Sequence, residues 1–474
     1  MKNYSRRKFV ETTVIGGVGA GIFPGLADSR KNISKICPED VSDPAGLKVP
    51  EQTPGRVYEA GKDILPPRFD TMRPVRDKHS ITVTVGQDCG EFRGNDDKIL
   101  QAAVDYVAGL GGGTVCIMPG VYTMRNSLFP RSGITIRGSG ETTILKKCAS
   151  VSSKLIREAD WYEYCVQVER PEGFTVGGGL ALSRDDKDPR EVRFFTITGI
   201  SNNVLFLDKR TEHNYWMMES ARASTRFSII YGFNVDNVVI SDLVLDGNRD
   251  ENEHVDDNYA SALFMQYCNR WNLKNVTARN YNSDGFSFQV CDDIHFEDCS
   301  AINNADLGYH PGSGSQRPVF IRCTARGNSQ GFFWCWGVCD GIAEDCLAEG
   351  NARYGINFGH RDTDNIIRNC IVENNGETGI IFREEPNEYR TGDRNLIDGC
   401  IIRNNGNAGP GLGIDIQYKT SDITIHNCRF ENRKGGLRHT GIRIGQDAER
   451  IKLESNTFSG IKVQVEDLRT RAKI

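Results

Sequence analysis

A short pattern that begins with glycine recurs through the second half of the chain and limits the folds the chain can adopt. The first and third positions after each glycine are apolar, as in Gly-Phe-Ser-Phe at 285, Gly-Phe-Phe-Trp at 331, Gly-Ile-Asn-Phe at 355 and Gly-Ile-Ile-Phe at 379. With Gly308 in the same phase, the starts from 285 to 379 lie 23 or 24 residues apart, and two longer gaps lead to further copies at 413 and 441. One such repeat cannot bury its own apolar face, so we predict that the repeats stack as a solenoid.

Two further columns follow the same period. A cysteine recurs once per repeat, at Cys299, Cys323, Cys346, Cys370, Cys400 and Cys428. An asparagine recurs four or five residues later, at Asn280, Asn304, Asn328, Asn351, Asn375, Asn405 and Asn432. A reduced cysteine is a small apolar filler, so we assign this column to the core and not to a metal site. Asparagine tolerates turn conformations, and stacked amides can bond along a column.

The composition agrees with this architecture and excludes some functions. Of 474 residues, 50 are glycine, which is typical of a chain with many tight turns. The net charge of −5 argues against a nucleic-acid partner, which would need a basic surface. The odd count of 15 cysteines argues against a complete disulfide framework.

The first residues are predicted to be an export signal. Residues 5–10, Ser-Arg-Arg-Lys-Phe-Val, resemble the twin-arginine signal; a mild apolar stretch and small residues at 25–27 follow. We therefore expect residues 1–27 to be removed and the mature protein to be periplasmic or secreted. The mature chain has no apolar run long enough for a membrane helix. Residues 28–80 are rich in proline and polar residues, so we predict a linker or strap.

Residues 81–147 are predicted to form an N-terminal cap and the first coils. A helix starting at Asp96-Asp97 and ending at the glycines 111–113 would plug the open end of the stack. Its apolar face is assigned to Ile99, Ala102, Ala103, Tyr106 and Val107. Residues 148–225 break the period, and segments 174–176, 194–197 and 204–207 alternate as antiparallel strands do. We expect a small inserted β-subdomain there and the parallel β-helix over 226–474.

Together these features resemble the right-handed parallel β-helix of the pectin-lyase-like superfamily, as in pectate lyases, polygalacturonases and mannuronan epimerases. The resemblance covers roughly residues 80–147 and 226–465. It implies an all-β, single-stranded solenoid with coils of about 23–24 residues, a capping helix and an inserted β-subdomain. It also implies an active groove along the strand that begins with the repeat glycine.

The chain departs from the catalytic motifs of these families. Asp292-Asp293 and Gly359-His360-Arg361 match two polygalacturonase motifs, but Asn-Thr-Asp and Arg-Ile-Lys are absent. The Asp-Pro-His-Glu motif of the epimerases and the Arg-x-Pro-x-x-Arg motif of pectate lyases are absent too. No catalytic residue is therefore transferred from these families.

Alternation along the groove strand predicts which side chains face outward. The second and fourth positions after the repeat glycine point out, because the first and third point in. This places His310, Arg383 and Asp415 on the outer face, with Gly312 and Gly359 leaving room for a sugar ring. The turns that follow add Trp336, His360, Arg361, Asp362, Glu384 and Glu385. Acids, bases and an aromatic ring within a few coils mark this cluster as the predicted site.

His310 lies in the most unusual string of the repeat, Tyr-His-Pro-Gly-Ser-Gly-Ser at 309–315. There it could act as acid, base or sugar ligand, with a surface histidine in a turn as the alternative. Asp284, one coil earlier, is placed to orient it. The acidic loop 246–258 should overhang the same groove. Its carboxylates are candidate Ca²⁺ ligands, although the spacing is not that of an EF-hand and a solvated loop is the simpler interpretation.

We interpret the chain as an exported enzyme that cleaves glycosidic bonds in a polysaccharide or oligosaccharide without a cofactor. In a glycoside hydrolase, Glu384 would be the acid and Asp362 or Asp415 the base, one coil away. The predicted substrate-binding residues, besides His310, are Asp284, Trp336, His360, Arg361, Arg383 and Glu385. The alternative is a lyase or epimerase acting on uronate glycans, in which histidine supplies the base and arginine the cation. The third hypothesis is a non-catalytic glycan-binding or structural β-helix.

Overall fold

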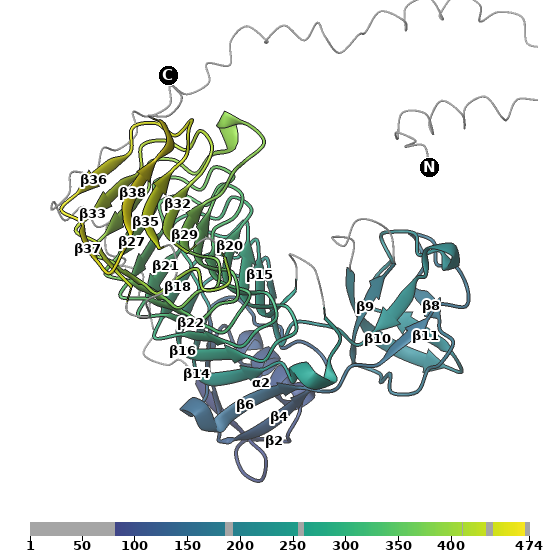
Figure 1. Cartoon of the computed structure of the whole chain (residues 1–474). Helices are drawn as coiled ribbons and strands as arrows, with labels where there is room; N and C mark the ends of the chain where they lie inside the picture. The colour runs from purple at the N-terminus through teal and green to yellow at the C-terminus, as the bar shows by residue number, and fades with distance from the viewer. Residues whose placement is uncertain (1–80, 185–192, 255–259, 410, 433–438, 470–474) are drawn as a thin grey trace, which may run out of the picture. The chain divides into compact units, whose positions relative to one another are not determined.

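The computed structural model describes residues 81–184, 193–254, 260–409, 411–432 and 439–469 (Figure 1). The predicted signal and linker therefore lie outside the described residues. Successive coils stack so that each contributes one strand to a ten-stranded parallel sheet and two short strands to a second sheet. From Leu263 to Ile380 the paired residues are 23 or 24 positions apart, for example Phe286 with Tyr309 and Phe332 with Ile356. The predicted parallel β-helix is confirmed.

The ten-stranded sheet carries the face on which the site was predicted. Its strands are, in order, β13 (Ile230–Phe233), β15 (Ser261–Gln266), β17 (Asp284–Gln289), β20 (Leu307–Gly312), β23 (Gln330–Phe333), β26 (Tyr354–Phe358), β29 (Thr378–Phe382), β32 (Leu412–Ile416), β35 (Thr440–Ile444) and β38 (Val463–Asp467).

The second sheet has twenty-two strands among the described residues and forms the other walls of the coil. They are β1 (Ile81–Gly86), β2 (Phe92–Arg93), β3 (Gly113–Ile117), β4 (Gly120–Met124), β5 (Ile134–Arg137), β6 (Thr143–Lys147), β14 (Val239–Asp246), β16 (Asn272–Arg279), β18 (His295–Glu297), β19 (Ser300–Ile302), β21 (Val319–Ile321), β22 (Thr324–Arg326), β24 (Ile342–Glu344), β25 (Leu347–Glu349), β27 (Ile366–Arg368), β28 (Ile371–Glu373), β30 (Leu396–Asp398), β31 (Ile401–Arg403), β33 (Thr424–His426), β34 (Arg429–Glu431), β36 (Lys452–Glu454) and β37 (Thr457–Ser459).

The core consists of columns of like side chains, as a stacked repeat requires. The rings of Phe286, Tyr309 and Phe332 stack with centroids 5.1 and 4.7 Å apart. The six cysteines of the predicted column are free thiols and all buried. Buried asparagines form a ladder in which the amide nitrogen of Asn351 donates to Oδ1 of Asn375 at 2.9 Å. The ladder contains Asn304, Asn328, Asn351, Asn375 and Asn405.

Asn280 and Asn432 do not belong to this ladder, contrary to the predicted column. The backbone amide of Tyr281 is the group that donates to Oδ1 of Asn304, so Tyr281 holds the ladder position of its coil. Asn280 has a φ of 51° and occupies the same turn position as Asn303, the residue that precedes Asn304 in the next coil. Spacing alone did not separate these adjacent turn positions, because asparagine suits both.

The predicted capping helix is present as α2 (Asp97–Gly109). The side chain of Asp96 caps it by accepting the amides of Lys98 and Ile99. Its apolar face differs from the prediction, since Leu100 and Val104 are buried while Tyr106 is 52% exposed. None of the helices in the described part of the chain is long and apolar enough to span a membrane.

A six-stranded antiparallel sheet is inserted between β6 and β13, as predicted (Figure 1). Its strand order is β7 (Ser152–Lys154), β12 (Arg222–Ser224), β9 (Gly179–Ser183), β10 (Arg193–Ser201), β11 (Val204–Leu207) and β8 (Cys165–Gln167). It has an apolar core of its own, which includes Leu180, Phe195 and Leu205. The segment 174–176, predicted as a strand, is not one, and β9 begins later at Gly179.

Candidate active site

The outer face of the ten-stranded sheet carries polar side chains between β17 and the turn after β29, interrupted by Phe333 in β23 and Ile381 in β29. The predicted alternation holds, because Phe286 and Phe288 enter the core while Ser287 contacts His310 on the outer face. Most of these outward groups are nevertheless buried: Ser287, His310 and Asn357 are at most 3% exposed. The site is therefore a set of fixed side chains and not an open polar surface.

Asp284 and His310 form a close pair on adjacent strands. Oδ2 of Asp284 lies 2.8 Å from Nδ1 of His310, and Oδ1 accepts the backbone amide of Leu307 at 2.9 Å. Both side chains are almost fully buried, and burial raises the pKa of Asp284 while the hydrogen bond from His310 acts against that rise. An ionised carboxylate only accepts, so Nδ1 is the donor to an ionised Asp284, and in the neutral imidazole the lone pair is then on Nε2. The expected orienting contact is thus present.

Phe333 separates His310 from Arg383 and touches both. The ring of His310 meets that of Phe333 edge-on at 5.3 Å, and the guanidinium of Arg383 lies 4.9 Å from the centroid of the same ring. Nη1 of Arg383 donates to Oδ1 of Asn357 and to the carbonyl of Trp334. The amide of Asn357 in turn donates to Oε1 of Gln330 at 2.8 Å. Gln330 precedes the repeat glycine, a position that the alternation argument did not consider.

The glycines on this face do not leave room for a sugar ring, contrary to the prediction. A Cβ added at Gly359 would lie 2.4 Å from Cζ of Arg383, and one at Gly312 would lie 2.5 Å from Oε1 of Gln289. Their neighbours fill the space that the missing side chains leave. Gly359 is therefore required for Arg383 to lie flat across its backbone.

Asp362 is fully buried and fixes the turn after β26. Its carboxylate accepts the amides of Gly337, Val338 and Gly359 at 3.0–3.1 Å, and Nη2 of Arg383 lies 3.7 Å away. Burial raises the pKa of Asp362 to about 7, against the effect of Arg383 and of the amide hydrogen bonds. The enclosed carboxylate therefore fixes the shape of this turn.

Glu385, His360 and Trp336 extend the cluster along the turns. Oε1 of Glu385 accepts the amide of His360 at 2.8 Å and Nε of Arg383 at 3.0 Å. The rings of His360 and Trp336 stack at 4.2 Å with planes only 6° apart. Burial lowers the pKa of His360, an effect that Glu385 opposes. Trp336 remains 49% exposed, so it presents the outer ring face of this stack.

Three predicted site residues lie outside the contacts of this cluster. Glu384 is exposed, and its side chain has no hydrogen bond within the described residues. Asp415 is buried in a bidentate pair with Arg443 and also accepts from Gln417. Arg361 is exposed and contributes its backbone amide to the carbonyl of Arg390. The alternation argument did not distinguish Glu384, which is exposed, from its neighbour Glu385, which is buried against Arg383.

The described part of the acidic loop contacts the residue before β20 at one end and the second sheet at the other. Nε2 of His254 lies 2.8 Å from Oδ2 of Asp306, and the carboxylate of Asp246 is paired with Arg279 at 2.9 Å. Residues 255–259 lie outside the described residues. In the part of the chain that the structure describes, no group of three or more His, Cys, Asp or Glu side chains could hold a metal ion.

One family model agrees with the architecture. This model, described as a right handed beta helix region, matches residues 261–389 and 387–472. The A-module of the Azotobacter vinelandii mannuronan C-5 epimerase AlgE4 is similar at 14% identity and TM-score 0.48, over 81% of this chain and 97% of that one. An alginate lyase from Paenibacillus sp. str. FPU-7 is similar at 12% identity and TM-score 0.40, over 81% and 99%. No curated protein sequence matches. The fold is a right-handed parallel β-helix.

Proposed function

We propose that this protein is a glycan lyase in which His310 removes a proton from a uronate residue. The observation that carries the proposal is the 2.8 Å contact between Asp284 and Nδ1 of His310. This contact orients the ring and makes Nε2 the basic atom, which has no hydrogen-bond partner among the described residues. A buried base that is held by a carboxylate but unoccupied at its other nitrogen is typical of general base catalysis.

The chemistry that this site supports is β-elimination. Nε2 of His310 takes the C5 proton, the electron pair forms the C4–C5 double bond, and the C4–O bond to the neighbouring sugar breaks. The departing oxygen receives a proton from the histidinium or from water. Nη2 of Arg383 makes no hydrogen bond within the described residues, so its N–H groups can bind the uronate carboxylate and stabilise the charge that develops.

Hydrolysis by a carboxylate pair has less support, because both predicted bases, Asp362 and Asp415, are already engaged, and only the predicted acid Glu384 is exposed. Asp362 accepts three backbone amides, and Asp415 is bound by Arg443. Asp292 and Asp293, which match a polygalacturonase motif, are both paired with Arg317. A general acid and base must be able to touch the substrate. We therefore favour the lyase over the hydrolase that the sequence alone suggested.

The test is to incubate the protein with polygalacturonate, alginate and a glucuronan while following the ultraviolet absorbance of the unsaturated product. We expect absorbance to rise with at least one of them, and His310→Gln and Asp284→Asn each to reduce the rate about 10²–10⁴-fold. The matched control is His426→Gln, because His426 forms the same 2.8 Å pair with Asp398 on the other sheet. Its rate should equal that of the unmodified protein.

Each other result would identify a different function. Release of reducing sugars without absorbance would favour the hydrolase, and binding without product would favour a glycan-binding protein. Equal rates for His310→Gln and His426→Gln would remove His310 from the mechanism. We also propose export through the twin-arginine segment, which Arg6→Lys together with Arg7→Lys should abolish in a cell-fractionation assay.

A further inference from the structure

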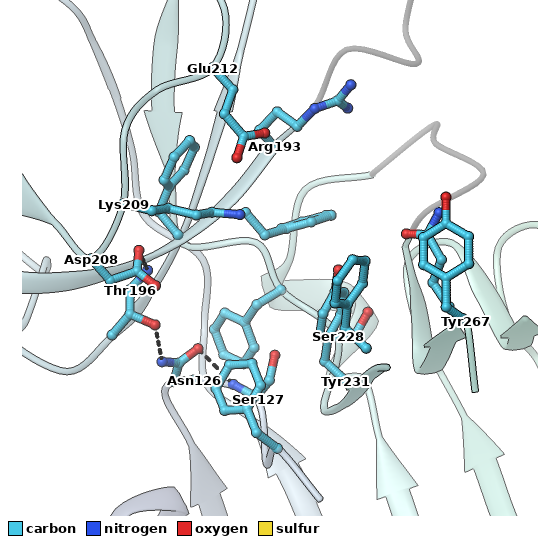
Figure 2. A pocket seen from close by; sticks show the side chains of 16 residues that line it. Asn126, Ser127, Arg193, Thr196, Asp208, Lys209, Glu212, Ser228, Tyr231 and Tyr267 are labelled. Carbon is cyan, nitrogen blue, oxygen red and sulfur yellow. Dashed lines mark hydrogen bonds between the residues drawn. The ribbon is translucent and has the colours of Figure 1, made fainter. Parts of the chain in front are cut away.

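A cavity of about 530 Å³ lies between the first coils and the inserted sheet (Figure 2). Asn126 anchors the two walls, since its amide donates to Oγ1 of Thr196 at 3.0 Å and to the carbonyl of Gly177 at 3.1 Å. The amide of Gly179 also donates to the carbonyl of Arg125 at 2.8 Å. The cavity is part of the folded structure, and neither His310 nor Arg383 lines it.

Partly exposed aromatic rings form the wall on the coil side. Phe129 meets Tyr231 edge-on at 6.1 Å, and Phe233 meets Tyr267 edge-on at 5.5 Å. Phe233 and Tyr267 remain 47% and 45% exposed. Lys209 reaches in from the opposite wall, with Nζ 5.3 Å from the ring of Phe195 (Figure 2). Aromatic faces with a few polar groups suit a sugar ring, which has apolar C–H faces and hydroxyl edges.

One wall of the cavity is in register with the strand that carries His310. Tyr231 pairs with Phe264, Phe264 with Ser287, and Ser287 with His310. These three steps across the sheet span ~14 Å at the usual distance between strands. Phe264 and Ser287 are fully buried, so a chain-like ligand that reaches both places would pass over these two residues without entering between the strands.

At each end of this path, the turn after the groove strand holds a bulky residue whose backbone is in the left-handed conformation. Tyr267 has a φ of 53° and Trp336, three coils later, a φ of 68°. That conformation is unfavourable for large side chains, but it belongs to the turn itself, since Val290, one coil after Tyr267, has the same φ of 53°. Both rings are held toward solvent at the same edge of the groove, since each is nearly half exposed.

We infer that this cavity is a second saccharide-binding site, which holds a sugar of the same glycan chain three strands away from the reacting bond. The inference rests on the proposed function for the identity of the chain. It predicts that the substrate is a chain long enough to reach both sites, so that affinity increases with length. The inserted sheet thereby acquires a role, because it supplies the second wall of the cavity.

The test replaces Tyr267 with alanine in the full-length protein. The control is Val290→Ala, because Val290 occupies the same turn position one coil later, with a φ of 53° and 44% exposure. KM is measured with disaccharide to octasaccharide fragments of whichever polysaccharide yields product. Loss of one aromatic contact predicts a KM about tenfold higher for the octasaccharide with Tyr267→Ala and no change for the shortest substrate. Val290→Ala should match the unmodified protein on both.

Binding measurements separate this inference from the proposed function. If no polysaccharide gives product, calorimetric titration with polygalacturonate and alginate still compares Tyr267→Ala with Val290→Ala. Weaker binding by Tyr267→Ala alone would support the second site even without lyase activity. Equal KM values at every length, or equal affinities for both variants, would overturn the inference whether or not the lyase proposal holds.

Discussion

Replacing Asn351 with alanine should destabilise the β-helix far more than a surface substitution does. Oδ1 of Asn351 accepts the backbone amide and the side-chain amide of Asn328, and its Nδ2 donates to the carbonyl of Ala325 and to Asn375. Alanine leaves the buried amide of Asn328 without its partner, at about 1–3 kcal/mol, and removes two bonds that Nδ2 donates, at about 0.5–1.5 kcal/mol each. The expected total is a loss of about 2–6 kcal/mol in the free energy of unfolding.

The measurement is the midpoint of guanidinium unfolding followed by far-ultraviolet circular dichroism. The control is Asn272→Ala, since the side chain of Asn272 makes no hydrogen bond in the described part of the chain and should change stability by less than about 0.5 kcal/mol. A midpoint for Asn351→Ala equal to that of Asn272→Ala would show that the amide ladder does not hold the coils together.

Three further predictions concern the site and its surroundings. Gly359→Ala should displace Arg383 and lower lyase activity about 10²-fold. The control is Gly109→Ala, whose added Cβ meets nothing within 4 Å and should leave activity unchanged; equal activity of the two variants would refute the need for glycine at 359. Asp362→Asn should lower stability by about 1–3 kcal/mol because an amide cannot accept both Gly359 and the other two N–H groups, and a gain in the unfolding midpoint would contradict this. Burial lowers the pKa of Lys147 to about 8, so between pH 8 and 10.5 the unfolded chain binds a proton that the folded chain does not. The free energy of unfolding should therefore rise by about 3 kcal/mol across this pH range in the unmodified protein but not in Lys147→Met. Parallel pH profiles for the two proteins would refute this prediction.

The fold could be predicted because its determinants are repetitive. Each coil contributes the same apolar positions, so a period of 23 or 24 residues identifies both the stacking and the inward face. The errors fall where one residue decides between neighbouring turn positions, as with Asn280 and Tyr281. The buried face of α2 was misassigned for a related reason. The apolar residues around Ile99 and Tyr106 are compatible with more than one choice of buried helix face.

The site was predicted only in part, because alternation gives the direction of a side chain and not what covers it. Asp284, His310, Arg383 and Glu385 are where the period places them, yet their partners come from other coils and from turns of unequal length. Gly359 illustrates the difference: from sequence, a missing side chain means empty space, but in the structure Arg383 occupies that space. The same packing buries Asp362, pairs Asp415 with Arg443 and holds His310 against Asp284, and the lyase proposal rests on that difference. The chemistry of this face therefore depends on which polar groups remain unpaired after stacking, and no repeat pattern encodes that directly.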